Sequence, residues 1–343
     1  MRLIDSCSHG SVPGLTRRLL FAVLATLAPA VAASPAGAAG HSTHSTPRAI
    51  SNVGIVDIYT TLGYQNGVAA GTGMILTRAG EVLTNNHVIR GATRFKVVDV
   101  TTHKTYTATV AGYSVTRDVA VLHLAHAAGL KTIKLGNGVR VRVGQPVVAR
   151  GNAQGLGGAP KEARGRVVAL HRQVLAKDET GESETLINMI ATDAPVVPGD
   201  SGGPLEDSQN RAIGMVTAGS TTGVHRGFAI PIRQALTYVR LIERGKASAT
   251  VHVGPTAFLG VDLRDVRGGA AVDQIIPGKA ADAAGLAAGD VITSLNGAGI
   301  SSSADVRKAV LSLVPGTAVA IAWTDANGVA QTGTITPTSG PPQ

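Results

Sequence analysis

Short apolar runs separated by turn residues occupy the chain from Val53 to about Pro231. Runs of this length and spacing predict short β-strands that assemble into a sandwich or a barrel. The expected strands are residues 53–60, 71–77, 94–100, 118–124, 145–150, 165–171, 185–192, 211–217 and 227–232. Residues 232–244 then change to a helical period. Four apolar positions share one face of this expected helix, namely Ile232, Leu236, Val239 and Ile242.

A different pattern begins at about residue 255, after a stretch over 245–254 that we expect to be a linker. The expected elements are strands at 258–263 and 271–277, a short helix at 279–284, a second helix and two final strands. Ser302 stands three residues before Asp305, which is the spacing of a helix-capping box. Asn327 and Gly328 predict the turn of a hairpin. The chain is therefore expected to hold two domains, the second of them a small α+β module.

Composition supports a fold class that is mainly β. The 343 residues are 44% hydrophobic but only 3% aromatic, and they include 43 glycines, so the cores must be built from aliphatic side chains between many turns. The formal net charge is +9. Because the basic residues are scattered and do not alternate with aromatic ones, the sequence argues against a nucleic-acid partner.

The N-terminus predicts export. Arg17 and Arg18 precede the apolar run 19–33, and small residues follow, so we expect a signal peptide over 1–39 and a flexible lead-in over 40–52. The run is shorter than the roughly 20 residues of a membrane span, so membrane contact is expected only if the leader is retained. The predicted location is the periplasm, the cell envelope or the exterior.

Neither a cofactor nor a metal ion is expected. The single cysteine, Cys7, lies in the expected leader, so the mature chain would have no disulfide and no cysteine-based metal site. His123 and His126 stand three residues apart in a pattern read as a strand, which would place their side chains on opposite faces. That arrangement does not favour a zinc pair.

The segment "VVPGDSGGPL", Val196–Leu205, surrounds Ser201 with glycine and proline. It satisfies the G-x-S-x-G pattern of the α/β-hydrolase nucleophile elbow, which needs a strand before the serine and a helix after it. Prolines interrupt both sides here, and the downstream histidines, His225 and His252, lie in a glycine-flanked turn and in the expected linker. We therefore interpret the segment as a shaped loop whose amides could stabilise an oxyanion.

Better partners for Ser201 lie upstream. In "TNNHVI", His87 follows a strand-turn-strand pattern and would project from a loop edge. In "RDVAVL", Asp118 begins an alternating strand, where a partly buried carboxylate needs a hydrogen-bond donor such as an imidazole N–H. A single histidine or aspartate in such a place is ordinarily a surface, capping or turn residue. Only the joint pattern indicates a catalytic group.

These three motifs, in this order, resemble the HtrA (DegP/DegQ/DegS) family of serine proteases from about Val53 to Pro337. The resemblance implies a trypsin-like serine protease domain over residues 53–244, with the chymotrypsin-like double β-barrel fold. It also implies a triad in which Ser201 is the nucleophile, His87 the general base and Asp118 the group that orients the histidine.

The resemblance further implies an oxyanion hole from the amides of Gly199 and Ser201, with Asp200 as a third candidate. Two positions depart from the family pattern, because Asp200 and Val197 stand where the family usually has asparagine. How the Asp200 carboxyl is neutralised stays open at this stage. The residues implied for the substrate pocket are Pro195, Gly227, Phe228, Ala229 and Ile230. Since Pro195 replaces the acid of trypsin-like pockets, we expect a preference for small aliphatic residues over lysine or arginine.

The second module, over 255–337, resembles an HtrA-type PDZ domain, followed by a tail over 338–343. The resemblance implies that a C-terminal peptide adds as a strand beside the "FLGV" segment, with its last side chain near Val306 and Val310. The residues implied for peptide binding are Phe258, Leu259, Gly260 and Val261. The alternative interpretation is that this segment is only a buried strand.

Together these features predict an exported, cofactor-free serine endopeptidase. The expected partners are misfolded or C-terminally tailed proteins of the envelope or exterior, and the resemblance implies a homotrimer. The alternative is a peptide-binding chaperone or adaptor whose triad rarely assembles.

Overall fold

The computed structural model of the chain describes residues 51–177, 183–219 and 227–343. The expected signal peptide, most of the expected lead-in, and His225 lie outside these residues. Strands predominate in the described part, which confirms the mainly β class. No helix of that part is long and apolar enough to cross a membrane.

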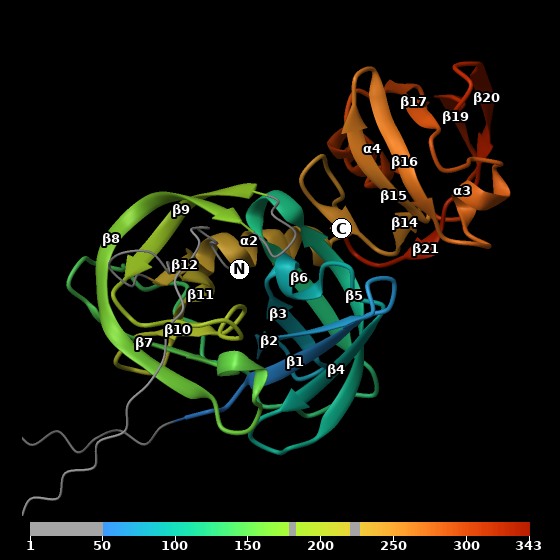
Figure 1. Ribbon diagram of the computed structural model, residues 1–343. Coiled ribbons are helices and arrows are strands. Elements are labelled where there is room, and N and C mark those ends of the chain that lie inside the picture. Colours follow the sequence, from blue (N-terminus) through green and yellow to red (C-terminus); the bar gives the residue numbers. More distant parts are fainter. Residues whose placement is uncertain (1–50, 178–182, 220–226) are drawn as a thin grey trace, which may run out of the picture. The chain divides into compact units, whose positions relative to one another are not determined.

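The first β-barrel is antiparallel and closes through pairing of β5 with β6 (Figure 1). Its strands, in the order β5-β4-β1-β2-β3-β6, are β1 (Ile55–Leu62), β2 (Gly67–Ile75), β3 (Glu81–Thr84), β4 (Arg94–Asp99), β5 (Thr105–Ser114) and β6 (Val119–Leu124). The helix α1 (Asn86–Ile89) follows β3, and the 3₁₀ turn η1 (Val115–Arg117) precedes β6. The strand β13 (His252–Val253) pairs with β5, so part of the expected linker belongs to this sheet.

The second β-barrel is also closed, in the order β10-β11-β12-β9-β8-β7. Its strands are β7 (Pro146–Gly151), β8 (Lys161–Lys177), β9 (Ser183–Thr192), β10 (Pro204–Glu206), β11 (Ala212–Gly219) and β12 (Gly227–Pro231), and the 3₁₀ turn η2 (Ala153–Gly155) follows β7. Pro146 and Pro204 are the first residues of their strands, where a missing N–H is tolerated. Two closed barrels confirm the double-barrel expectation.

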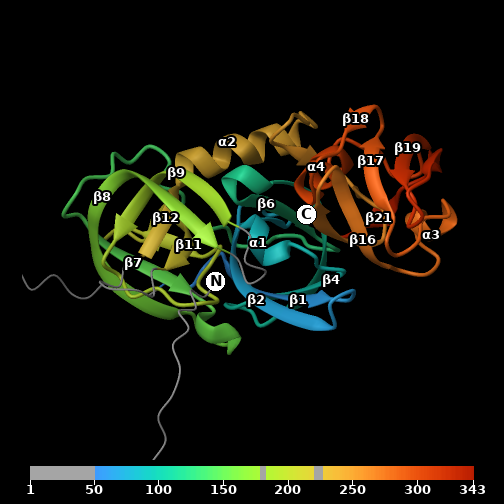
Figure 2. The same cartoon turned by 45° about the horizontal axis from the view of Figure 1, so that its top comes forward.

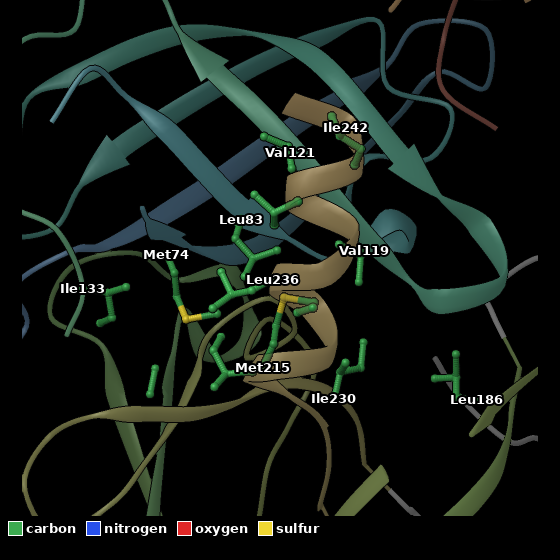
Figure 3. Close-up of a cluster of buried hydrophobic side chains, with 14 of the residues drawn as sticks. Met74, Leu83, Val119, Val121, Ile133, Leu186, Met215, Ile230, Leu236 and Ile242 are labelled. Atoms are coloured by element: carbon green, nitrogen blue, oxygen red, sulfur yellow. The ribbon is translucent and has the colours of Figure 1, made fainter. Parts of the chain in front are cut away.

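One hydrophobic cluster joins the two barrels and the helix α2 (Ile232–Glu243). Figure 3 shows Met74 and Leu83 of the first barrel near Met215 of the second, with Leu236 of α2 beside them. The four apolar positions predicted for this helix are all 8% exposed or less. Burying a side chain of this size contributes about 1.5–3 kcal/mol. Figure 2 shows α2 running alongside both barrels, and this shared core holds the loops at their junction in place.

The C-terminal domain has its own core, which includes Ile292, Val306 and Trp323. Its sheet follows the order β15-β16-β17-β19-β20. The elements are β14 (Thr256–Phe258), β15 (Val261–Val266), β16 (Gly269–Ile275), α3 (Ala280–Ala283), β17 (Val291–Leu295), β18 (Ala298–Gly299), α4 (Ser303–Val310), β19 (Val319–Thr324), β20 (Ala330–Ile335) and β21 (Thr338–Gly340). Strand β14 pairs with β21, which lies in the expected tail.

Local predictions for this domain hold in two places and fail in one. The Ser302 hydroxyl accepts a hydrogen bond from Asp305 N at 3.2 Å, as a capping residue does. The hairpin of β19 and β20 closes with Gly328 at φ +82°. The single strand expected over 258–263 is wrong, because the chain breaks between β14 and β15. Gly260 at φ +78° makes this break, a conformation that favours glycine.

Candidate active site

Asp118 and His87 meet at the first barrel, where the segment after β3 lies beside the segment before β6. Asp118 follows η1 and takes a left-handed conformation, φ 51°, with its N–H donating to Val115 O. His87 lies on α1, one turn of helix, and not on a loop edge as expected. Asn85 Nδ2 donates to Asp118 O at 2.8 Å, so the segment before the histidine is tied directly to the aspartate.

The Asp118 carboxylate is 2% exposed and accepts hydrogen bonds from three groups. His87 N donates to Oδ1 at 3.0 Å, and His87 Nδ1 lies 2.9 Å from Oδ2. Thr217 Oγ1 also donates to Oδ2. Because a carboxylate can only accept, the proton of the imidazole must sit on Nδ1. The lone pair of Nε2 is then left for a proton from substrate or nucleophile, and the His87 side chain is 26% exposed.

Thr217, on β11, links the two sides of the site. Its hydroxyl contacts Asp118, and its carbonyl oxygen accepts a hydrogen bond from Ser201 Oγ at 3.3 Å. The sequence alone does not reveal this role of Thr217, because the alternation of β11 shows only that its side chain is buried. The contacts of Thr217 with Asp118 and Ser201 form only when both barrels are closed.

Neighbouring groups hold the carbonyls of the nucleophile loop, residues 197–201. Val197 O accepts from Asp200 N at 3.1 Å, Pro198 O from Gln154 N at 2.6 Å, Gly199 O from Thr72 Oγ1 at 2.7 Å, Asp200 O from Gly203 N at 2.9 Å and Ser201 O from Thr72 N at 2.8 Å. In a trans peptide the N–H points away from the C=O of the same plane. The held carbonyls of Pro198 and Asp200 therefore fix the directions of the Gly199 and Ser201 amides.

Two of the three amides predicted for the oxyanion hole are free to act there. No hydrogen bond within the described residues takes up the N–H of Gly199 or Ser201. The Asp200 N–H is instead used within the turn, on Val197 O, so Asp200 is not retained as a donor. Gly199 has φ +96°, and a Cβ there would lie 2.1 Å from Asn152 O, which is why only glycine fits.

The Asp200 side chain is 4% exposed and turns back into its own loop. Val197 N donates to Oδ2 at 2.9 Å. Burial raises the pKa of this carboxyl to about 6, and the hydrogen bond from Val197 partly opposes the rise. Within the described residues this carboxyl forms no ion pair, so the Val197 amide is its hydrogen-bond partner and Oδ1 is buried without one.

The five residues predicted for the substrate pocket do not share one environment, and Phe228 is partly buried against the core between the barrels. Ile230 belongs to the core between the barrels and Ala229 to the core of the second barrel, and both are 0% exposed, so neither lines an open pocket. A Cβ at Gly227 would meet the Val196 side chain at 3.0 Å, which places β12 beside the nucleophile loop. Pro195 is exposed and lies two residues before that loop.

Of the peptide-binding residues predicted for the second domain, only Val261 lies in the main sheet, whereas Phe258 ends β14, which pairs with β21 outside that sheet. β15 is the terminal strand in the order of that sheet, and the turn at Leu259 and Gly260 leads into it. Leu259 is 3% exposed and belongs to the core, as do Val306 and Val310 of α4. An edge strand beside a helix is the arrangement that strand addition by a peptide requires.

Comparison with known proteins agrees with this geometry. The family profile described as a trypsin-like peptidase domain matches residues 71–215, and the profile described as a PDZ domain matches residues 257–324. Two closed barrels with a histidine–aspartate pair and a serine loop at their junction, followed by a PDZ domain, define the class as trypsin-like peptidases with a PDZ module.

Individual relatives narrow the class to a family. The chain is 34% identical over 303 residues to serine protease PepD of Mycobacterium tuberculosis, covering 82% of this chain and 63% of that protein. It is 34% identical over 261 residues to periplasmic pH-dependent serine endoprotease DegQ of Escherichia coli, covering 73% and 55%. It is 35% identical over 273 residues to periplasmic serine endoprotease DegP of Salmonella typhimurium, covering 75% and 54%.

A solved structure, the HtrA-type protease AlgW with tripeptide, shares the fold at a TM-score of 0.50 and 27% identity, covering 85% of this chain and 96% of that one. The chain belongs to the HtrA family of serine proteases. It spans 54–63% of the length of the three curated relatives named above.

Proposed function

We propose that this chain is a serine endopeptidase with the triad His87, Asp118 and Ser201. The observation that carries the proposal is the buried Asp118 carboxylate, which accepts from both the backbone N–H and the Nδ1–H of His87. This arrangement sets the tautomer that a general base needs. The names of the relatives, which are serine proteases and endoproteases, support the same reaction class.

The first half-reaction follows from this geometry. Ser201 Oγ attacks the scissile carbonyl carbon while His87 Nε2 takes the hydroxyl proton. The carbonyl oxygen becomes an oxyanion, which the amides of Gly199 and Ser201 stabilise. His87 then gives the proton to the leaving amine, and an acyl-enzyme remains. Before attack, the Ser201 hydroxyl must turn from Thr217 O toward His87, a rearrangement that substrate binding can drive.

Water completes the cycle by the same steps. It loses a proton to His87 Nε2 and attacks the acyl carbon, and Ser201 Oγ leaves with that proton. Asp118 stabilises the imidazolium in both halves.

For substrates, we propose unfolded or C-terminally tailed proteins, with small aliphatic residues before the cleaved bond. The PDZ domain would take the tail beside β15, through the segment Phe258–Val261, and present the rest of the chain to the protease domain. The two domains are proposed to span 53–244 and 255–337. An exported chain that assembles as a homotrimer is part of the same proposal, which the periplasmic relatives support only as regards export.

A non-cleaving chaperone is the second candidate, and one observation favours it. The described hydrogen bond of the Ser201 hydroxyl is to Thr217 O, which is the geometry of a nucleophile at rest. The test below separates the two candidates.

The decisive experiment compares Ser201→Ala with the wild type on fluorescently labelled, unfolded casein. We expect cleavage to be lost and the melting temperature to be retained. Ser208→Ala, at an exposed serine of the turn after β10, is the matched control and should cleave normally. Labelling by a fluorophosphonate, with and without a C-terminal peptide, then reports whether Ser201 is reactive. Binding of casein by a wild type that neither cleaves nor labels would support the chaperone instead.

A further inference from the structure

The Thr72 side chain reaches the nucleophile loop from the other barrel. Thr72 lies on β2 and is 0% exposed. Its hydroxyl donates to Gly199 O at 2.7 Å and accepts from Asn152 N at 2.8 Å. A hydroxyl has one proton to give, so the donor is used entirely on the loop that carries Ser201.

The backbone of Thr72 adds to this contact. Thr72 N donates to Ser201 O at 2.8 Å, and Thr72 O accepts from Thr84 Oγ1 at 2.7 Å. A Cβ at Gly202 would lie 2.0 Å from Thr72 O, so the two chains approach as closely as glycine allows. One residue of β2 therefore holds carbonyls on both sides of Asp200.

The same hydroxyl connects two loops that together orient the hole. Asn152 begins the turn that carries Gln154, whose N–H holds Pro198 O at 2.6 Å. Because Pro198 O and the Gly199 N–H share one peptide plane, the turn after β7 sets the direction of the first hole amide. The Thr72 hydroxyl links the two segments, because it accepts from Asn152 N in this turn and donates to Gly199 O in the nucleophile loop.

We propose that Thr72 is a positioning residue for the oxyanion hole, with its hydroxyl holding the nucleophile loop and the turn after β7 in the orientation that directs the Gly199 amide at the oxyanion. This inference rests on the proposed peptidase function. Thr72 does not touch substrate. It acts by preventing rotation of the peptide planes on which transition-state stabilisation depends.

The test is a set of full-length variants. Thr72→Val keeps the shape of the side chain but leaves Gly199 O and Asn152 N without their partner, and Thr72→Ser restores the hydroxyl. Thr60→Val removes another buried threonine hydroxyl of the same barrel, one that donates to Ala69 O within the sheet, and is the matched control. Casein turnover gives kcat and KM, and fluorophosphonate labelling gives the reactivity of Ser201.

For Thr72→Val we expect kcat to fall by roughly 10–100-fold, with KM within about twofold of the wild type and labelling slowed in parallel. Thr72→Ser and Thr60→Val should remain near the wild type. Wild-type kcat in a folded Thr72→Val protein, an equal loss in Thr60→Val, or no rescue by Thr72→Ser would overturn the inference. If Thr72→Val does not fold, Thr72→Cys, whose thiol is a weak donor, replaces it under the same criteria.

The two proposals fail differently. Cleavage by Ser201→Ala would defeat the peptidase proposal whatever Thr72 does. Normal turnover by Thr72→Val, beside an inactive Ser201→Ala, would defeat only the role of Thr72.

Discussion

The two halves of the proposed active site are built by different means. In the half built on the first barrel, side chains set the geometry, because the Asp118 carboxylate orients His87 and accepts a hydrogen bond from Thr217 of the second barrel. In the second barrel, the loop 197–201 acts through its backbone, with carbonyls held so that two amides stay available. The first half therefore depends on which functional groups are present. The second depends on the conformation that glycine permits and on the neighbours that fix it.

The largest expected loss of activity follows from a change in the side-chain half of the site. Asp118→Asn keeps the size of the residue but can no longer accept the Nδ1 proton as a carboxylate does, so the wrong tautomer is favoured. We expect kcat on casein to fall by about 10⁴-fold with the fold retained. Asp262→Asn, at an exposed carboxylate of the PDZ domain, is the control. A loss of less than tenfold would show that this pair does not orient the base.

A smaller loss should follow when the backbone half is disturbed. Gly199→Ala forces a Cβ toward Asn152 O at a residue with φ +96°, so the loop must move and the hole amides lose their alignment. We expect kcat to fall by about 10²–10³-fold, the range for loss of one oxyanion donor. Gly138→Ala, where nothing lies within 4 Å of the added Cβ, should behave as the wild type. Equal activity of the two variants would contradict an oxyanion hole whose amides are held in place by the loop.

The smallest expected effect concerns stability and comes from Asp200. Its pKa is raised from 3.8 to about 6 in the folded state, so folding takes up a proton. The contribution of this group to the free energy of unfolding is therefore present below about pH 4 and is lost as the pH rises through about 6. The loss amounts to roughly 3 kcal/mol for a shift of about two units.

Asp200→Asn should remove this pH dependence and be the more stable protein at pH 8. Urea unfolding at several pH values between 4 and 8 measures the difference in the free energy of unfolding between wild type and variant. For the control Asp262→Asn, this difference should not change with pH. A difference that does not change with pH, or one of opposite sign, would show that burial does not raise the pKa of this carboxyl.

Several elements could be predicted because their signals are local. The apolar face of α2, the cap at Ser302 and the hairpin at Gly328 each depend on residues a few positions apart. The strand β5 was missed because its Thr- and Ala-rich sequence carries no apolar run, although three other strands pair with it. The break at Gly260 was missed because the apolar residues on both sides suggested one continuous strand.

By itself, the sequence determined which residues could serve as nucleophile, base and acid, since side-chain chemistry and motif spacing are written in the chain. It also determined that Ser201 would lie in a glycine-rich loop. Only the tertiary structure decided that Thr72 and Thr217 hold this loop and the acid, and that the Asp200 amide is used within its own turn. The contacts of Thr72 and Thr217 join positions about a hundred residues apart, and they exist only when strand register and the closure of both barrels bring those positions together.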